Sequence, residues 1–297
     1  MGAHRAGIGH SGRMMVALTA KAATGHAWDQ AAHGWNRHTT IIRAWLEEAT
    51  RAMLDAARIA PGASVLDIAA GAGDQTLDIA LRVGPQGRVL ATDISAAILA
   101  LAADNARQAG WRNVDTRVAD AQALGLEGAG FDAAVCRLGL MFCQAPPEAL
   151  RAARSALKPG GRFSALVFSQ PQHNPCLGVM MSTALRHAGS PPRPPCAPGT
   201  LMSLGEPGLL ARLLHTAGFV DIEIQTIDAP FRLPTGRDYV DFVRTAGSPI
   251  MEILAPLPVS ARSAAWADMA EQLKVFNTPT GWVGPNQLLL GAATAPL

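Results

Sequence analysis

The sequence predicts a doubly wound α/β fold built on a seven-stranded sheet, and two patterns support this. Short apolar runs that indicate buried strands alternate with helical patterns, and three successive runs each end in an aspartate. In open α/β sheets, ligands bind beyond the carboxyl ends of the strands. The three aspartates therefore predict a ligand site at one edge of the sheet.

The first apolar run, residues 65–68, is followed by a glycine pair and then by a helical pattern from Thr76. A strand, a turn and a helix in this order form the first half of a βαβ unit. Gly71 and Gly73 let the chain turn sharply and let a ligand approach the backbone. The first amides of the following helix then face that ligand.

Asp67 indicates which ligand this turn favours. A dinucleotide fold places a pyrophosphate here, which a carboxylate would repel, and Thr76 stands where G-x-G-x-x-G requires its last glycine. S-adenosylmethionine carries an ammonium and a sulfonium, so a nearby carboxylate stabilises it. The turn therefore favours S-adenosylmethionine over a nicotinamide dinucleotide.

Two motifs resemble those of a known superfamily. Residues 67–73, Asp-Ile-Ala-Ala-Gly-Ala-Gly, resemble the acidic, glycine-rich first motif of the class I S-adenosylmethionine-dependent methyltransferases. Residues 158–161, Lys-Pro-Gly-Gly, resemble the tight turn that leads into the fifth strand of these enzymes, here residues 163–168. The likeness covers roughly residues 40–230 and is to the ubiquinone/menaquinone C-methyltransferase group and related small-molecule methyltransferases. It implies a Rossmann-like methyltransferase sheet, with S-adenosylmethionine as cofactor and S-adenosylhomocysteine as product.

Asp93 ends the second strand about twenty residues after the glycines, where nucleotide folds place a carboxylate on the ribose hydroxyls. Its two oxygens can accept both hydroxyl protons, and Ile94 would then lie against the adenine. Alternatively, Asp93 only caps the helix that begins at Ser95. The glycine turn favours ribose binding.

The resemblance implies further cofactor contacts. Asp120 and Ala121, at the end of the third strand, would meet the edge of the adenine, although an aspartate in a turn is also common. Arg137 and Leu138, after the fourth strand, would border the methionine end, and Arg137 is equally well read as a sheet-edge arginine. The full set of predicted cofactor residues is Asp67, Ala69, Gly71, Gly73, Thr76, Asp93, Ile94, Asp120, Ala121, Arg137 and Leu138.

The chemistry of methyl transfer to an oxygen or an enolizable carbon calls for a base, and His173 is the best placed histidine because it follows the fifth strand. A lone loop histidine is more often a surface residue, and His33, His38 and His187 are weaker alternatives. The sequence has no G-x-S-x-G elbow and no H-E-x-x-H or paired His/Cys spacing, so it predicts neither a serine hydrolase nor a metal site.

The chain divides into a core and additions to it. We expect a flexible leader over 1–20, an N-terminal helical cap over 21–60 and a cofactor-binding core over 61–169. A lid insertion at 170–204 precedes the C-terminal part of the core, 205–297, which carries a helical insertion at about 234–280. Candidate substrate contacts, against the alternative of simple core packing, are Trp28, Trp35, Met141 and Met180.

Composition narrows the partners. The formal net charge of +2 gives no indication of a nucleic-acid surface. The loop after the fourth strand lacks the Asn/Asp-Pro-Pro-Tyr/Phe signature of methyltransferases that act on bases or protein amides. The four cysteines have no C-x-x-C pairing and are expected to be reduced, and no apolar run reaches the ~18 residues of a membrane span. We expect a cytoplasmic monomer or homodimer.

The sequence therefore predicts methyl transfer to carbon or oxygen of a hydrophobic small molecule of an aromatic, polyketide, quinone or prenylated kind. Two other classes stay open. One is a binding or sensor protein that keeps the cofactor site without turnover. The other is a nicotinamide-dependent reductase, which the position of Asp67 disfavours.

Overall fold

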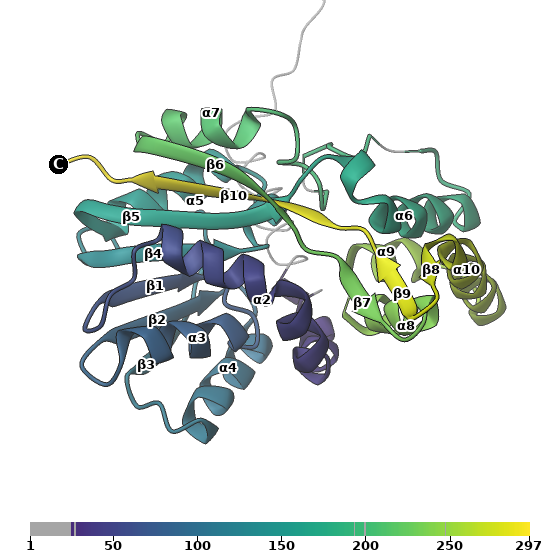
Figure 1. Ribbon diagram of the computed structural model, residues 1–297, viewed down its shortest axis with the longest axis horizontal. Helices are drawn as coiled ribbons and strands as arrows, with labels where there is room; N and C mark the ends of the chain where they lie inside the picture. Colours follow the sequence, from purple (N-terminus) through teal and green to yellow (C-terminus); the bar gives the residue numbers. More distant parts are fainter. Residues whose placement is uncertain (1–24, 27, 193, 199, 247) are drawn as a thin grey trace, which may run out of the picture.

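The computed structural model describes residues 25–297 apart from 27, 193, 199 and 247. The predicted leader at 1–20 lies outside these residues. A seven-stranded sheet with the order β3-β2-β1-β4-β5-β10-β6 forms the centre (Figure 1). Its strands are β1 (Ser64–Ile68), β2 (Arg88–Asp93), β3 (Val114–Val118), β4 (Phe131–Arg137), β5 (Leu157–Phe168), β6 (Val220–Asp228) and β10 (Gln287–Thr294). The predicted doubly wound sheet is confirmed.

The first five strands pair in parallel, and β10 runs antiparallel between β5 and β6. The sheet order reverses between β1 and β4, so the carboxyl ends of these two strands flank the point where open α/β sheets bind ligands. The central strands consist of nearly unbroken apolar runs because helices cover both of their faces.

Five helices belong to the sheet: α2 (Thr39–Ala56), α3 (Asp74–Val83), α4 (Ala96–Gln108), α5 (Pro146–Ala156) and α7 (Leu209–Thr216). In Figure 1, α2 and α3 lie in front of the sheet and α5 lies behind it. Residues 28–37 are also helical and precede α2. The apolar stripe of α2, from Ile42 to Leu54, is buried against β4, β5 and β10.

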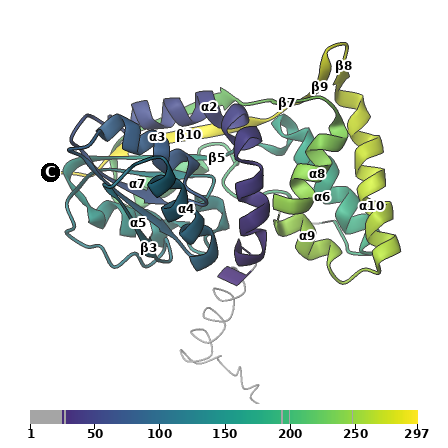
Figure 2. The same cartoon turned by 90° about the horizontal axis from the view of Figure 1, so that it is seen from below.

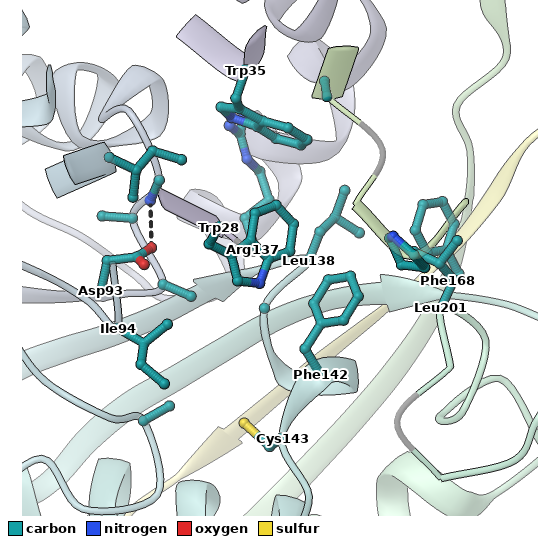
Figure 3. Close-up of a pocket in the computed structure, with 18 of the residues that line it drawn as sticks. Trp28, Trp35, Asp93, Ile94, Arg137, Leu138, Phe142, Cys143, Phe168 and Leu201 are labelled. Carbon is teal, nitrogen blue, oxygen red and sulfur yellow. Dashed lines mark hydrogen bonds between the residues drawn. The ribbon is translucent and has the colours of Figure 1, made fainter. Parts of the chain in front are cut away.

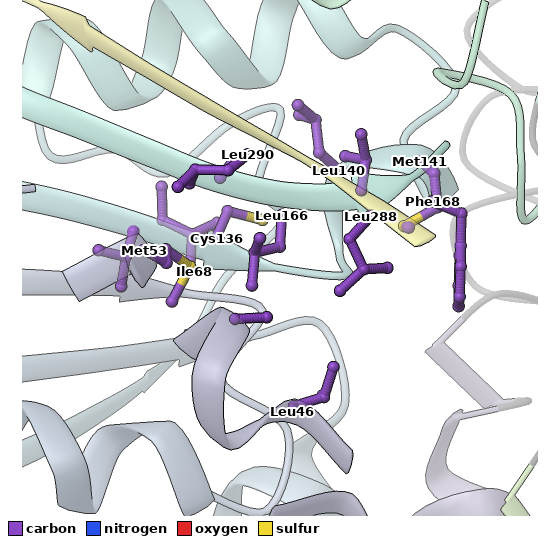
Figure 4. Close-up of a cluster of buried hydrophobic side chains, with 14 of the residues drawn as sticks. Leu46, Met53, Ile68, Cys136, Leu140, Met141, Leu166, Phe168, Leu288 and Leu290 are labelled. Atoms are coloured by element: carbon purple, nitrogen blue, oxygen red, sulfur yellow. The ribbon is translucent and has the colours of Figure 1, made fainter. Parts of the chain in front are cut away.

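The main core lies between these layers, where side chains from α2 and from the central strands meet. Figure 4 shows part of it. Leu46 and Met53 of α2 belong to the same buried cluster as Ile68, Cys136, Leu166 and Leu290, and all six side chains are at most 3% exposed. This packing fixes the strand ends that carry the site.

The two predicted insertions form a single cap. The first supplies α6 (Pro175–His187), and the second supplies α8 (Gly236–Ala246), α9 (Ser248–Leu254) and α10 (Val259–Gln272). These helices pack on one another beside the sheet (Figure 2). Asp268 of α10 holds the first insertion by accepting from Arg186 at 2.6 Å and by bonding His187 at 2.9 Å.

Short elements complete the cap. A small sheet of order β7-β9-β8, with strands Phe231–Leu233, Gly281–Gly284 and Asn277–Thr278, adjoins the helices. Three 3-10 turns, η1 (Leu140–Phe142), η2 (Pro171–His173) and η3 (Leu273–Phe276), link longer elements. Neither the small sheet nor α9 was expected from the sequence. Among the helices that the structure describes, none is long and apolar enough to span a membrane.

The Lys-Pro-Gly-Gly turn has a different form from the one predicted. Residues 158–161 lie inside β5, which begins at Leu157 and not at Phe163. The pairing register with β4 shifts at this point, and Gly160 has φ +77°, a conformation that favours glycine. The backbone of this bulge forms hydrogen bonds with Ala295, the residue after β10. Gly160 N donates to Ala295 O at 2.9 Å, and Ala295 N donates to Gly161 O at 2.8 Å.

Candidate active site

One cavity of about 470 Å³ lies between the carboxyl ends of β1, β2 and β4 and the cap. Figure 3 shows ten of its lining residues by name, with Asp93 and Ile94 on one side and Phe142, Phe168 and Leu201 on the other. The sequence predicted a site at this edge of the sheet. Its lining includes these predicted residues: Trp28, Trp35, Ala69, Gly71, Asp93, Ile94, Asp120, Ala121, Arg137 and Leu138.

The glycine turn adopts backbone conformations that explain its composition. Ala69, Gly71 and Gly73 have φ values of 55°, 59° and 86°. A Cβ on Gly73 would lie 2.9 Å from the Cβ of Ala102, so glycine at this position lets α3 and α4 approach closely. Gly71 lines the cavity, whereas Gly73 lies behind it.

Asp67 is fully buried and does not line the cavity. Its carboxylate accepts hydrogen bonds from Thr76 Oγ1 at 2.6 Å and from Gln75 Nε2 at 2.8 Å. Burial raises the pKa of Asp67 to about 7, and the two hydrogen bonds only partly oppose this. Asp67 and Thr76 therefore do not touch a ligand in the cavity, and any effect of Asp67 on a ligand passes through its neighbours.

Gln75 is the neighbour that connects Asp67 to the cavity, and the sequence analysis missed it. Gln75 lines the cavity and is 2% exposed. The side-chain nitrogen of Gln75 donates to Asp67, which fixes the orientation of the carboxamide. The carboxamide oxygen accepts no hydrogen bond from the described residues, so it can accept one from a ligand. The signal was present in the sequence, since Gln75 opens the helix that follows the glycine turn.

Asp93 lies at the end of β2 with both carboxylate oxygens held. Gly71 N donates to Oδ2 at 3.0 Å, and Ser95 N donates to Oδ1 at 3.0 Å. Each oxygen keeps a further lone pair for a ligand hydroxyl. Burial raises the pKa of Asp93, and the backbone hydrogen bonds oppose this. The carboxylate thus caps the turn and also faces the cavity, so both readings of Asp93 are compatible with the geometry.

The N-terminal helical segment is joined to this corner. Asp29 accepts from Ser95 Oγ and from Ala97 N, the latter at 3.3 Å, so helix 28–37 is tied to the start of α4. Asp120 and Ala121 line the neighbouring wall, and Asp120 Oδ1 accepts from Gln122 N at 2.9 Å. Asp93 and Asp120 therefore both line the cavity, and Asp29 binds the backbone and hydroxyl of residues that follow Asp93.

Arg137 is a buried cation in the cavity wall. Its guanidinium donates to Asp74 at the start of α3 and to Thr50 Oγ1 of α2 at 2.9 Å. The side chains of Arg137 and Asp74 are each 4% exposed. Next to it, Leu138 has φ 57° and its amide donates to Leu166 O at 2.9 Å. Arg137 is therefore more than a sheet-edge arginine, because it joins three elements behind the site.

Aromatic rings form the opposite side. The Trp28 ring lies 5.2 Å from Phe142 and 6.2 Å from Trp35 between ring centroids, and Trp35 lies 6.4 Å from Phe242. Trp28 and Trp35, two candidate substrate contacts from the sequence, thus line the cavity, as do Phe142 and Phe242, which were not predicted.

Besides Asp67, Gly73 and Thr76, three further predicted site residues lie outside the cavity lining. Met141 and Met180 are fully buried in the core and do not line the cavity, whose wall is formed by Phe142 and Leu177 at neighbouring positions. His173 is exposed in η2 and also lies outside the cavity lining. The buried residue next to His173 is Asn174, whose side-chain oxygen accepts from Gln287 N at 3.0 Å. The geometry therefore does not support His173 as the base or the two methionines as substrate contacts.

The four cysteines form no disulfide in the part of the chain that the structure describes. Cys143 lines the cavity, and burial raises the pKa of its thiol to about 12, so it is a neutral thiol near pH 7. The described residues contain no group of His, Cys, Asp and Glu side chains that could hold a metal ion.

Comparison with known proteins agrees with this geometry. Residues 39–182, just under half of the chain, match the model of the ubiE/COQ5 methyltransferase family. A ubiquinone/menaquinone biosynthesis C-methyltransferase of Hahella chejuensis is 36% identical over 132 residues, which cover 44% of this chain and 51% of that protein. Its counterpart in Idiomarina loihiensis is 38% identical with the same coverage. The chain thus spans about half the length of the curated relatives that it matches.

Solved structures share the fold over more of the chain. The YcgJ protein of Bacillus subtilis superposes with a TM-score of 0.57 at 18% identity and covers 84% of this chain and 99% of its own. The phosphoethanolamine N-methyltransferase 2 of Haemonchus contortus, solved with S-adenosylhomocysteine, gives 0.53 at 18% identity, with 84% and 53% covered. The chain therefore shares the fold of these solved structures and is similar over residues 39–182 to the ubiE/COQ5 methyltransferase family.

Proposed function

We propose that the protein transfers a methyl group from S-adenosylmethionine to carbon or oxygen of a hydrophobic small molecule. One observation supports this above the others. A single cavity joins the carboxylate-bearing strand ends to a wall of aromatic rings under the cap. Such a cavity has room for a charged nucleoside at one end and an apolar acceptor at the other.

The residues at the sheet end fit the cofactor. Asp93 is placed to accept from the ribose hydroxyls, Ile94 to lie against the adenine, and Asp120 with Ala121 to meet its edge. We assign Gln75 to the methionine ammonium, because its free carboxamide oxygen is an acceptor held in place by Asp67. Arg137 is the cation available to the methionine carboxylate.

S-adenosylmethionine supplies an electrophilic methyl group on a good leaving group. The chain's own contribution is then to hold the acceptor in line and to keep water out, since the aromatic wall is apolar. The titratable side chains among the described lining residues are Asp93, Asp120, Arg137, Cys143 and Tyr239. With the cysteine neutral and His173 outside, we infer that approximation and desolvation supply most of the acceleration.

The acceptor is hydrophobic in this proposal because of the cap. A quinone-type acceptor agrees with the names of the curated relatives. However, α8, α9 and α10 lie outside the residues that match the family, so Tyr239, Phe242 and Ile250 of the cavity lining come from a part of the chain that the comparison does not cover. We therefore keep the acceptor as an aromatic, polyketide, quinone or prenylated molecule.

The first test is calorimetric titration with S-adenosylhomocysteine, and with NADP(H) in parallel. Micromolar binding of S-adenosylhomocysteine alone is expected. Replacing Asp93 by Ala should weaken it by about 1.5–3 kcal/mol, the range for hydrogen bonds to charged groups. Asp115→Ala, an exposed change on β3, is the matched control and should leave the affinity unchanged. Equal affinity in the Asp93 variant would remove Asp93 from the ribose.

Turnover is tested separately with S-adenosylmethionine labelled in its methyl group. Label should enter a hydrophobic quinol or phenol and not a hydrophilic amine. Binding of S-adenosylhomocysteine without transfer to any such acceptor would favour a binding or sensor protein. Binding of NADP(H) in its place would contradict the cofactor assignment.

A further inference from the structure

Part of the cavity lining consists of aromatic rings that come from several elements. We call it the aromatic chamber, and it consists of Trp45, Phe168, Leu177, Phe231 and Tyr239. The Trp45 ring stacks on Phe231 at 4.0 Å between centroids, and Phe231 meets Tyr239 edge-on at 4.9 Å. Each of these side chains is at most 8% exposed. The chamber is therefore an apolar space with flat walls.

Nearly all polar atoms around this chamber are already used. Trp45 Nε1 donates to Ala229 O at 2.8 Å and to Asn286 Oδ1 at 3.1 Å. Trp282, which stacks on Tyr239 at 5.1 Å, donates its Nε1 to Leu273 O at 2.7 Å. Neither indole nitrogen is left to recognise a ligand.

The hydroxyl of Tyr239 differs. Tyr239 is 1% exposed, and its hydroxyl makes no hydrogen bond with the residues that the structure describes. Among the described residues, two buried side-chain atoms have no solvent contact and no hydrogen-bond partner: Arg154 Nε and Ser164 Oγ. The Tyr239 hydroxyl is not one of them, so it opens onto the cavity that its side chain lines. A buried hydroxyl without a partner is costly, and a ligand oxygen would remove that cost.

We propose that the Tyr239 hydroxyl donates a hydrogen bond to an oxygen of the bound acceptor, so that the aromatic chamber selects a flat ring compound that carries such an oxygen. The proposal rests on the proposed function, because it takes the ligand in the chamber to be the methyl acceptor. Tyr239 comes from α8, outside residues 39–182, so the proposed hydrogen bond is made by the cap, whereas Trp45, Phe168 and Leu177 of the chamber lie within the residues that match the family.

The hydroxyl acts as a donor and not as a base. Burial, with a smaller contribution from Cys176, raises the pKa of Tyr239 well above its ordinary value. The phenol therefore stays neutral over the working range of the protein. Its role is to position the acceptor, and it takes no proton from it.

The chain offers an unusually direct test because Tyr239 is its only tyrosine. Incorporation of 3-fluorotyrosine gives one fluorine NMR signal, which Tyr239→Phe should abolish. The two probes are 1-naphthol and 1-methylnaphthalene, which share a shape and differ in the oxygen. Titration with 1-naphthol should shift the signal, and equilibrium dialysis should show it binding about fivefold to tenfold tighter than 1-methylnaphthalene.

Tyr239→Phe removes only the oxygen, so it should bind the two probes equally while binding S-adenosylhomocysteine as before. Ser182→Ala, which removes an exposed hydroxyl of the cap on α6, is the matched control and should keep the preference. An unshifted fluorine signal, no preference in the wild type, or a preference that survives in Tyr239→Phe would overturn the proposal. Loss of S-adenosylhomocysteine binding in the wild type would contradict the proposed function alone, because the probe preference is measured without cofactor.

Discussion

The two walls of the cavity use polar groups in different ways. On the sheet wall, the charged groups of Asp93, Asp120 and Arg137 are each held by neighbouring residues. On the opposite wall, here called the cap wall, the rings of the aromatic chamber stack on one another. Among the described residues, the Tyr239 hydroxyl has no hydrogen-bond partner there. The sheet wall therefore presents a fixed pattern of charge, whereas the cap wall presents mainly a shape.

The two sides of the cavity should therefore respond differently to substitution. A buried ion pair is also part of the fold, so removing one of its partners should cost stability. A ring or hydroxyl on the cap wall should instead change which acceptor is preferred, as proposed for Tyr239. Three further substitutions test this difference between the two walls.

Replacing Arg137 by Met should have the largest effect. It leaves the Asp74 carboxylate buried at the start of α3 without its cation, and it also removes the hydrogen bond to Thr50. We expect a loss of about 3–5 kcal/mol in the free energy of unfolding, as for other broken buried pairs. Urea denaturation followed by circular dichroism measures it.

The matched control for this change is Arg88→Met. Arg88 pairs with Asp115 at 3.5 Å, and their side chains are 60% and 65% exposed. That substitution should cost about 0–1 kcal/mol because solvent screens the pair. Similar losses of unfolding free energy in the two variants would contradict the description of Arg137 and Asp74 as a buried ion pair.

Asp67→Asn should have an intermediate effect that depends on pH. The folded state binds the proton of Asp67 more tightly than the unfolded chain, since its pKa rises from 3.8 to about 7. The stability that this carboxyl contributes is therefore present below about pH 4 and is lost as the pH rises to about 7. Relative to wild type, the asparagine variant should gain on the order of 1–4 kcal/mol between these limits.

Chemical denaturation at a series of pH values measures this gain, with Asp55→Asn as the control because Asp55 lies in an exposed pair with Arg82. The control should run parallel to wild type. The Asp67 variant should also bind S-adenosylhomocysteine more weakly, because asparagine no longer fixes the amide of Gln75 in one orientation. A pH dependence identical to that of wild type would mean that Asp67 is not the buried acid described here.

The same contrast separates what the sequence could predict from what it could not. The glycine turn and the aspartates at 67, 93 and 120 each lie within a few residues of a strand end, so local pattern placed them at one sheet edge. The pattern could not tell that Asp67 turns inward to Thr76 and Gln75, because that depends on how α3 sits on β1.

The cap wall was harder to predict from the sequence because its residues lie far apart along the chain. Trp45, Phe168 and Tyr239 come from α2, β5 and α8, and only tertiary packing brings them together. Within η1, Met141 enters the core and its neighbour Phe142 enters the cavity. A three-residue turn has no periodicity that would distinguish them.

The smallest expected effect belongs to His173→Ala. The sequence placed this histidine after the fifth strand, where a base would be needed, but the side chain is exposed in η2 and outside the cavity lining. We expect turnover with the best acceptor to change by less than about twofold, since surface substitutions away from a site have small effects. Asn174→Ala is the informative comparison, because Asn174 bonds Asn286 at 2.6 Å beneath the chamber and its loss should disturb Trp45. A large fall in kcat for His173→Ala with unchanged cofactor affinity would restore the histidine as the base and would require η2 to move over the cavity during turnover.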